Sequence, residues 1–237
     1  MTYYFKPNVL GDPHTILFAK TDKIFEFNFE KEEVTPIYRF KKPLYNQPNQ
    51  FVTNDDQSIM TVSSSSDGVW IDTVNQVEKD LDELYNIGSI LCLSFDLEDR
   101  AFYFLCNCLE SIIGFYLIKF DERRPENYKF ICKWKHKLNI GDANMQIMRG
   151  QDEKRVYKEL VISYKTIYIN TFNVVISDLS AETNNVLLKH EAFQLWESSV
   201  SSILLSVSKD LLSFSKSGIN VLALGNVEKR PIVDNLG

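Results

Sequence analysis

Two stretches that lie far apart in the chain share one pattern of residues. Residues 55–72 contain a polar turn, a short apolar segment ending at Ser63, a tight turn at Asp67-Gly68 and a second apolar segment. Residues 209–222 repeat this succession, with Ser215 and Gly218 in the matching places. A unit that recurs in this way buries its faces against neighbouring copies, so the repeat constrains the architecture of the whole chain.

Polar turn signals recur along the chain at intervals that suit a repeat. They are Gly11-Asp12, Asp55-Asp56, Glu98-Asp99, Gln151-Asp152 and Lys209-Asp210. Their second members are 44, 43, 53 and 58 residues apart, and repeats of ~40–45 residues with four short strands are typical of propeller blades. The two longer intervals require inserted loops, for which residues 121–128 and 180–185 are the candidates.

Short apolar or alternating segments follow these signals and predict paired strands. The predicted pairs are 15–19 with 23–30, 101–106 with 112–120, and 159–163 with 166–170 around a turn at Tyr164-Lys165. Phe25, Phe27 and Phe29 alternate and are expected on one face. Residues 77–84 have apolar spacings of four and three, which allow two helical turns, but so short a segment favours a linker between blades.

Residues 51–72 resemble a WD repeat of the β-propeller superfamily. Phe51–Asp56 matches the strand end and turn, Ile59–Val62 the middle strand, and Ile71-Asp72 the position of the Trp-Asp dipeptide. Residues 203–222 are similar, with Val221-Leu222 at that position, whereas the other units fit by length and alternation only. The resemblance implies an all-β propeller of four-stranded blades, incomplete or open, in a single domain over residues 1–237 with about five repeat units.

The bulk composition predicts a folded domain within the cell. The chain has 237 residues, of which 44% are hydrophobic and 24% charged, so disorder is not expected. No secretory signal precedes the apolar segments, and none of these reaches the ~20 residues of a membrane-spanning helix. The four cysteines are therefore expected as free thiols, and a cytoplasmic location, with the cytoskeleton or cilium as options, follows.

No motif for catalysis or phosphate binding occurs, so we predict neither an enzyme nor a bound cofactor. Cys106-Asn107-Cys108 is the most metal-like feature, and Cys92 and Cys132 would complete four thiolates. Structural zinc, however, usually takes cysteines from turns, whereas this pair lies in an apolar strand, which favours core packing. The alternative of a metal-dependent propeller enzyme rests on the carboxylates at corresponding turns: Asp56, Glu98, Asp152 and Asp210.

A run of alternating lysines is the predicted partner-binding site. Residues 129–137 read Lys-Phe-Ile-Cys-Lys-Trp-Lys-His-Lys, so a regular strand places its lysines on one face. These lysines are Lys129, Lys133, Lys135 and Lys137. Such a basic stripe suits an acidic partner, and the alternative is a solvated edge strand whose lysines deter aggregation.

We therefore predict a non-catalytic scaffold that contacts other proteins, as a structural subunit of a larger cytoskeletal, ciliary or organellar assembly. Fold-level analogy alone supports the choice of assembly. Weak nucleic-acid binding through the lysine stripe is a further alternative, against which the net charge of −6 counts.

Overall fold

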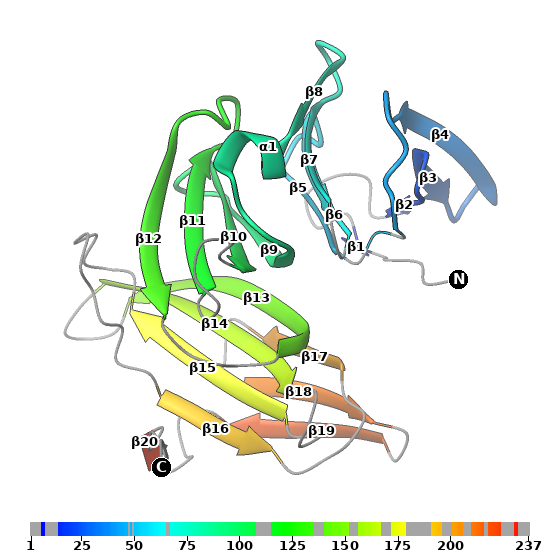
Figure 1. Cartoon of the computed structure of the whole chain (residues 1–237). Coiled ribbons are helices and arrows are strands. Elements are labelled where there is room, and N and C mark those ends of the chain that lie inside the picture. Colours follow the sequence, from blue (N-terminus) through cyan, green and yellow to red (C-terminus); the bar gives the residue numbers. More distant parts are fainter. Residues whose placement is uncertain are drawn as a thin grey trace. The chain divides into compact units, whose positions relative to one another are not determined.

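A computed structural model describes residues 6–7, 14–46, 48, 50–64, 67–107, 115–134, 140–151, 156–166, 172–178, 191–195, 201–205, 210–215, 218–223 and 230–231. One five-residue helix apart, the regular elements of these residues are β-strands in antiparallel sheets (Figure 1). The prediction of an all-β fold is thus confirmed. The chain separates into two compact units, residues 1–136 and 137–237, so the prediction of a single domain stays a prediction.

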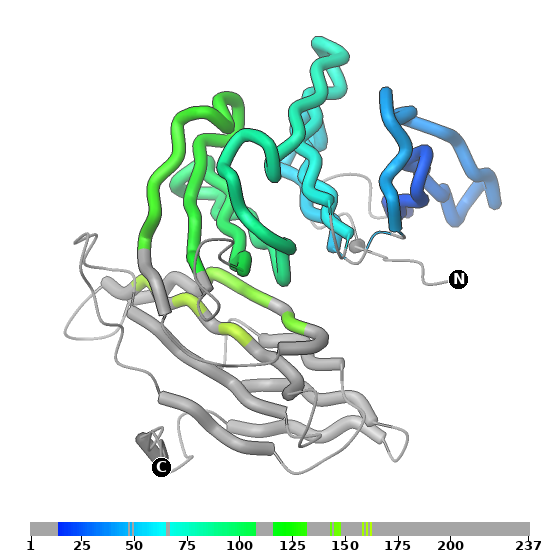
Figure 2. The backbone as a smooth tube through the Cα atoms, viewed as in Figure 1, coloured from blue at the N-terminus to red at the C-terminus, as the bar shows by residue number. Residues whose placement is uncertain are grey.

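The described residues of the first unit form three four-stranded sheets, which follow one another along the chain. Figure 2 shows the path of the chain through this unit, from blue to green. The first sheet contains β1 (Lys6–Pro7), β2 (Thr15–Ala19), β3 (Lys23–Asn28) and β4 (Glu33–Arg39). The second contains β5 (Gln50–Thr53), β6 (Ile59–Ser63), β7 (Gly68–Asp72) and β8 (Val77–Asp80). The third contains β9 (Ile90–Asp96), β10 (Ala101–Asn107), β11 (Phe115–Asp121) and β12 (Tyr128–Trp134). Each strand pairs with the strand that follows it, as the predicted four-stranded repeat requires.

The described residues of the second unit form two sheets. The larger one has the order β13 (Ile140–Gln151), β14 (Val156–Thr166), β15 (Phe172–Asp178), β16 (Glu191–Leu195) and β20 (Arg230–Pro231). The smaller one has the order β17 (Ser201–Leu205), β18 (Asp210–Ser215) and β19 (Gly218–Ala223).

Both copies of the sequence repeat form the predicted hairpin. Ser63 pairs with Gly68 at the turn end of β6 and β7, and Ser215 pairs with Gly218 at the turn end of β18 and β19. β6 and β7 are buried along their whole length. Because successive side chains of a strand point to opposite faces, both faces of the second sheet are covered.

Two local predictions were wrong. The turn expected at Tyr164-Lys165 lies inside β14, where these residues pair with Asn173 and Phe172. Neither residue favours a turn over a strand, and alternation continues through them. Residues 77–84 are not a linker: Val77–Asp80 form β8, and α1 (Leu81–Tyr85) follows directly.

Helix α1 is short but capped at both ends. Asp80 Oδ1 accepts hydrogen bonds from the backbone N–H groups of Asp82 (2.9 Å) and Glu83 (3.1 Å). Asn86, at φ 51°, ends the helix in the left-handed conformation. Leu81 and Tyr85 are buried, so α1 contributes one side to the core.

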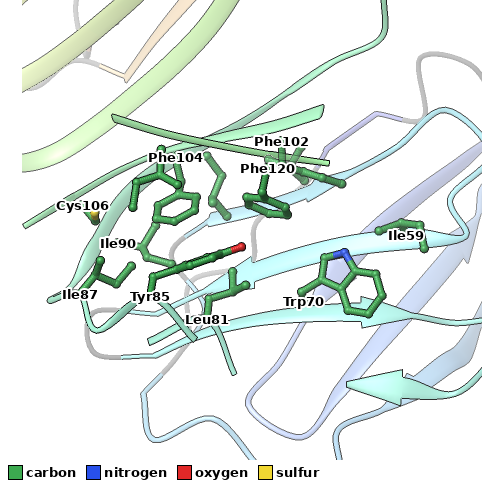
Figure 3. Packing of buried hydrophobic residues seen from close by; sticks show 13 residues of the cluster. Ile59, Trp70, Leu81, Tyr85, Ile87, Ile90, Phe102, Phe104, Cys106 and Phe120 are labelled. Carbon is green, nitrogen blue, oxygen red and sulfur yellow. The ribbon is translucent and has the colours of Figure 1, made fainter. Parts of the chain in front are cut away.

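Two apolar clusters join the three sheets of the first unit face to face. The first joint, between the first and second sheets, buries Leu17, Ala19, Ile24, Tyr38, Phe40, Leu44, Phe51, Met60, Val62, Val69 and Ile71. The second joint, between the second and third sheets, buries Val52, Ile59, Trp70, Leu81, Tyr85, Ile87, Ile90, Leu93, Phe102, Phe104, Cys106, Ile118 and Phe120 (Figure 3). In the second joint the rings of Phe102 and Phe120 stack at 5.4 Å.

Candidate functional site

A recurring turn follows the third strand of each sheet in the first unit. The last residues of these strands are Asn28, Asp72 and Asp121. In each case the Oδ1 atom accepts hydrogen bonds from the backbone N–H groups two and three residues later, at 2.9–3.0 Å. A side chain that bonds its own backbone in this way fixes the turn locally, so these residues have a structural role.

Asp72 stands at the end of the Ile71-Asp72 pair that carries the WD-repeat resemblance. Its Oδ2 atom also accepts a hydrogen bond from Asn75 Nδ2 at 2.8 Å. Burial alone opposes ionisation of this carboxyl, but the hydrogen bonds from Asn75 and Val74 hold its pKa below the ordinary value. Gln76 then takes a positive φ of 55°, as Glu32 does four residues after Asn28. The same turn geometry thus recurs in two successive sheets.

A charged cluster connects the turns of the second and third sheets. Arg100, at positive φ in the β9–β10 turn, donates from Nη1 to Asp55 Oδ1 at 2.6 Å and from Nη2 to Glu122 Oε1 at 2.9 Å. These hydrogen bonds raise the pKa of Arg100 and lower that of Asp55. The guanidinium also lies 5.9 Å from the ring centre of Phe95. Arg100 therefore bridges the β5–β6 turn to the β11–β12 turn.

Glu122 is the most buried member of this cluster, with a side chain 7% exposed. Its backbone carbonyl accepts a hydrogen bond from Trp70 Nε1 at 2.9 Å, and its N–H donates to the Arg100 carbonyl at 3.0 Å. Arg123 Nε lies 3.5 Å from Oε1. Among the described residues Oε2 has no hydrogen-bond partner. A buried carboxylate held this way makes the loss of Arg100 costly.

Two further contacts tie the β11–β12 turn to the second sheet and to α1. The hydroxyl of Tyr85 donates to the carbonyl of Pro125 at 2.5 Å, and Lys79 Nζ lies 2.6 Å from Glu126 Oε2. Lys79 Nζ also lies 5.4 Å from the ring centre of Trp70. The inserted loop predicted at residues 121–128 is thus an anchored part of the second joint.

A second polar group lies where α1 meets the start of β7. Asp82 Oδ2 accepts a hydrogen bond from the N–H of Gly68 at 3.0 Å. A Cβ atom on Gly68 would lie 2.3 Å from Ile90 Cδ1, so any larger residue here would require the buried Ile90 side chain to move. Burial, and then the neighbouring carboxylates of Asp80 and Asp67, raise the pKa of Asp82 to about 7, against the opposing Gly68 hydrogen bond.

The predicted lysine stripe is only partly within the described residues. Lys129 is exposed in β12 and Lys133 belongs to the same strand, whereas Lys135 and Lys137 lie outside the described residues. The pairing of β11 with β12 is irregular: Phe130 opposes Ile118 and Cys132 opposes Leu117, so Ile131 is an extra residue. Such a bulge interrupts the two-residue period on which the prediction of a shared lysine face rests. The role of Lys129 and Lys133 in partner binding stays a prediction.

The described residues contain only part of the cysteine and carboxylate candidates: Cys108 and Asp152 lie outside them, and so do the side chains of Cys132 and Asp210. Cys106 is buried in the second joint, and its Sγ donates to the carbonyl of Tyr116 at 3.6 Å, as core packing predicts. Asp56 accepts a hydrogen bond from Ser58 Oγ in the β5–β6 turn, and Glu98 lies in the β9–β10 turn. Among the described side chains no group of three or more His, Cys, Asp or Glu residues is arranged to hold a metal ion.

The bridging residues themselves were missed by the sequence analysis. Arg100 and Glu122 are 22 positions apart and Trp70 and Glu122 are 52 apart, so no motif spacing connects them. The available signal was indirect: residues 121–128, which contain Glu122, were a candidate insertion. The cluster has the properties of a structural joint, since its charged groups are bonded to one another across two sheets.

Comparisons with known proteins show similarity to solved structures in fold only. No family model matches it, and no curated protein matches it. The solved structure of U3-55K, a WD40 β-propeller, is similar with a TM-score of 0.54 and 12% identity, over 94% of this chain and 61% of that one. An auxiliary nutrient binding protein from Bacteroides thetaiotaomicron is similar with a TM-score of 0.53 and 11% identity, over 94% of this chain and 54% of that one.

The chain therefore spans less than two thirds of each of these two structures. At such identities the likeness shows the fold: a β-rich protein built from several antiparallel sheets. No described helix is both long and apolar enough to cross a bilayer.

Proposed function

We propose that the chain is a propeller-like scaffold that acts by binding other proteins, as a structural part of a larger assembly. One observation carries this proposal: three successive four-stranded meanders are stacked through buried apolar faces and tied together at their turns. Propellers display loops and outer strands on such a rigid body, and the similarity to a WD40 propeller supports the same interpretation. The clustered polar groups of the first unit hydrogen-bond to one another at the two joints and therefore have a structural role.

Affinity capture with chemical cross-linking tests the proposal. The full chain is used as bait in native lysate, and cross-linked peptides are identified by mass spectrometry. We expect a protein partner at near-stoichiometric yield, cross-linked to exposed side chains of the first unit, with the yield lost in a Trp70→Ala variant that disrupts the second joint. Recovery of no stoichiometric protein would contradict a scaffold role.

The same preparation discriminates the alternative functions. A stoichiometric divalent ion in the purified protein would favour a metal-dependent enzyme, with Asp56, Glu98, Asp152 and Asp210 as the first positions to substitute. RNA binding with a steep salt dependence would favour nucleic-acid recognition. No arrangement among the described side chains specifically supports either alternative, so the scaffold remains our proposal.

A further inference from the structure

The fourth strands of the three sheets in the first unit differ in how well their free edges are protected. β4 has Pro36 at its centre, and β8 has only four residues before α1 begins. Proline and short length both hinder the addition of another strand. β12 has seven residues without proline or glycine and is the terminal strand of its sheet (Figure 1). Apart from the bulge at Ile131, it is the longest edge of these three without proline.

One face of β12 presents aromatic side chains to solvent. Tyr128 is 37% exposed and Phe130 45% exposed, with ring centres 5.6 Å apart. Phe130 also contacts Tyr116 edge-on at 5.3 Å, and Tyr128 lies 4.6 Å from Tyr85 of α1. The inner end of this row is thus anchored in the second joint, while Tyr128 and Phe130 offer a rigid apolar surface.

The other face of β12 presents Lys129 to solvent. Lys129 pairs in register with Lys119, whose Nζ lies 2.6 Å from Asp99 Oδ2. Lys129 is exposed, and no ion pair with it is found among the described side chains. Two copies of β12 would bring like charges together, whereas a strand with carboxylates would complement Lys129.

We propose that β12 accepts an extended acidic segment of another protein as a fifth strand. The backbone of the segment pairs with the free edge of β12, its apolar side chains contact Tyr128 and Phe130, and its alternate carboxylates meet Lys129. An extended peptide with apolar and acidic residues in alternation presents these two sets on opposite faces. The proposal deepens the proposed scaffold function, on which it rests, by naming the chemistry of one partner.

Titration with a synthetic peptide tests this directly. The probe is a fluorescein-labelled ten-residue peptide of alternating valine and glutamate, added to the full chain at low salt and followed by fluorescence anisotropy. We expect saturable binding that weakens about tenfold in Phe130→Ser, since one desolvated aromatic contact contributes on the order of a factor of ten. Lys129→Glu should weaken binding by a similar factor. The exposed Glu83→Gln variant, placed on α1, is the matched control and should bind like the parent chain.

Backbone pairing has its own readout. Two N-methylated probes, one methylated at every valine and one at every glutamate, remove alternate sets of N–H donors. Because alternate N–H groups of a strand point to one side, only one of the two probes should lose binding. Equal binding of both probes, or no binding of the parent probe at millimolar concentration, would overturn the proposal.

The same variants distinguish two other ligands of the β12 edge, and binding of either would overturn the proposal. Binding of an oligonucleotide that depends on Lys129 but not on Phe130 would mean an electrostatic nucleic-acid surface. Concentration-dependent dimerisation abolished by Phe130→Ser would mean that a second copy occupies the edge. If partner capture from lysate persists unchanged in Phe130→Ser, the scaffold function stands while this proposal fails.

Discussion

The two joints of the first unit bury similar apolar clusters but differ in their polar connections. At the first joint, two carboxylates of the second sheet among the described residues bond to β4 or to the segment that follows it. Glu78 Oε2 accepts from Tyr38 Oη at 3.2 Å and from the N–H of Lys41 at 2.9 Å, and Asp67 Oδ2 accepts from the N–H of Tyr45 at 2.7 Å. The second joint has the Arg100 bridge, the Trp70 and Tyr85 hydrogen bonds to the β11–β12 turn, and α1 inserted beside it. The hydrophobic effect stabilises a contact between two sheets but is non-directional. Hydrogen bonds are directional, so they fix how the two sheets are positioned against each other. We therefore expect the first sheet to separate more readily than the third.

Removal of the Trp70 side chain should have the largest effect on this comparison. Trp70→Ala deletes a 2% exposed ring from the second joint and leaves the Glu122 carbonyl without its indole donor. Large-to-small changes of this kind cost about 3–5 kcal/mol in the free energy of unfolding. Urea denaturation followed by circular dichroism measures the loss. A cost below about 1.5 kcal/mol would mean that the second joint is not the stronger one.

The Arg100 bridge should rank second. Arg100→Met leaves the buried Glu122 carboxylate without its closest cation, and we expect a loss of about 2 kcal/mol, below the value for fully buried pairs because Arg100 is 39% exposed. The double variant Arg100→Met, Glu122→Gln should recover part of it, as a double-mutant cycle would show. Lys79→Met removes the exposed pair with Glu126 and is the matched control, with an expected cost under about 0.5 kcal/mol. Equal costs for both single variants would remove the distinction between bridge and surface pair.

Asp82 should give the second joint a pH dependence of defined sign. Its pKa of about 7 in the fold exceeds its ordinary value of 3.8, so between these values the folded chain holds a proton that the unfolded chain has lost. Stability from this group is complete below about pH 4, declines as the pH rises, and is lost above pH 7. Asp82→Asn, which stays neutral, should therefore stabilise the chain at pH 8 by about 1–2 kcal/mol after allowance for solvent screening.

Parallel denaturation curves of the parent chain and Asp82→Asn between pH 4 and pH 8 measure this difference. Glu83→Gln, the exposed neighbour in α1, is the control and should leave the pH profile unchanged. If the difference between the parent chain and Asp82→Asn does not grow with pH, Asp82 is already ionised in the fold at low pH.

Features that depend on a few neighbouring residues were predicted correctly from the sequence, whereas features that depend on contacts between distant residues were not. The hairpin of β6 and β7 was predicted because Asp67-Gly68 and the alternating apolar residues act over a few positions. The turn at Tyr164-Lys165 was misplaced because strand length depends on a partner strand that the local sequence does not specify. The bulge at Ile131 and the Arg100–Glu122 bridge depend on contacts between separate strands and turns. These long-range features decide where the two-residue period of a strand is interrupted and which charges are neutralised, so the candidate site was less predictable than the fold.

The smallest predicted effect concerns the hydrogen bond between Tyr38 and Glu78 in the first joint. Burial, and then the charge of Glu78, raise the pKa of Tyr38 to about 12, so its hydroxyl stays a donor to Glu78 at ordinary pH. Tyr38→Phe removes this hydrogen bond and should cost about 0.5–1 kcal/mol, because Glu78 keeps its bond from Lys41 and reaches water. Tyr85→Phe, the matched change in the second joint, leaves the buried Pro125 carbonyl without that donor and should cost more, about 1–2 kcal/mol. Native-state hydrogen exchange distinguishes the two: Tyr38→Phe should speed exchange in β2 and β3 only, whereas Tyr85→Phe should speed it in β10 and β11. Acceleration of all three sheets together in both variants would mean that the joints open as one cooperative unit, and the contrast between them would then hold for structure but not for stability.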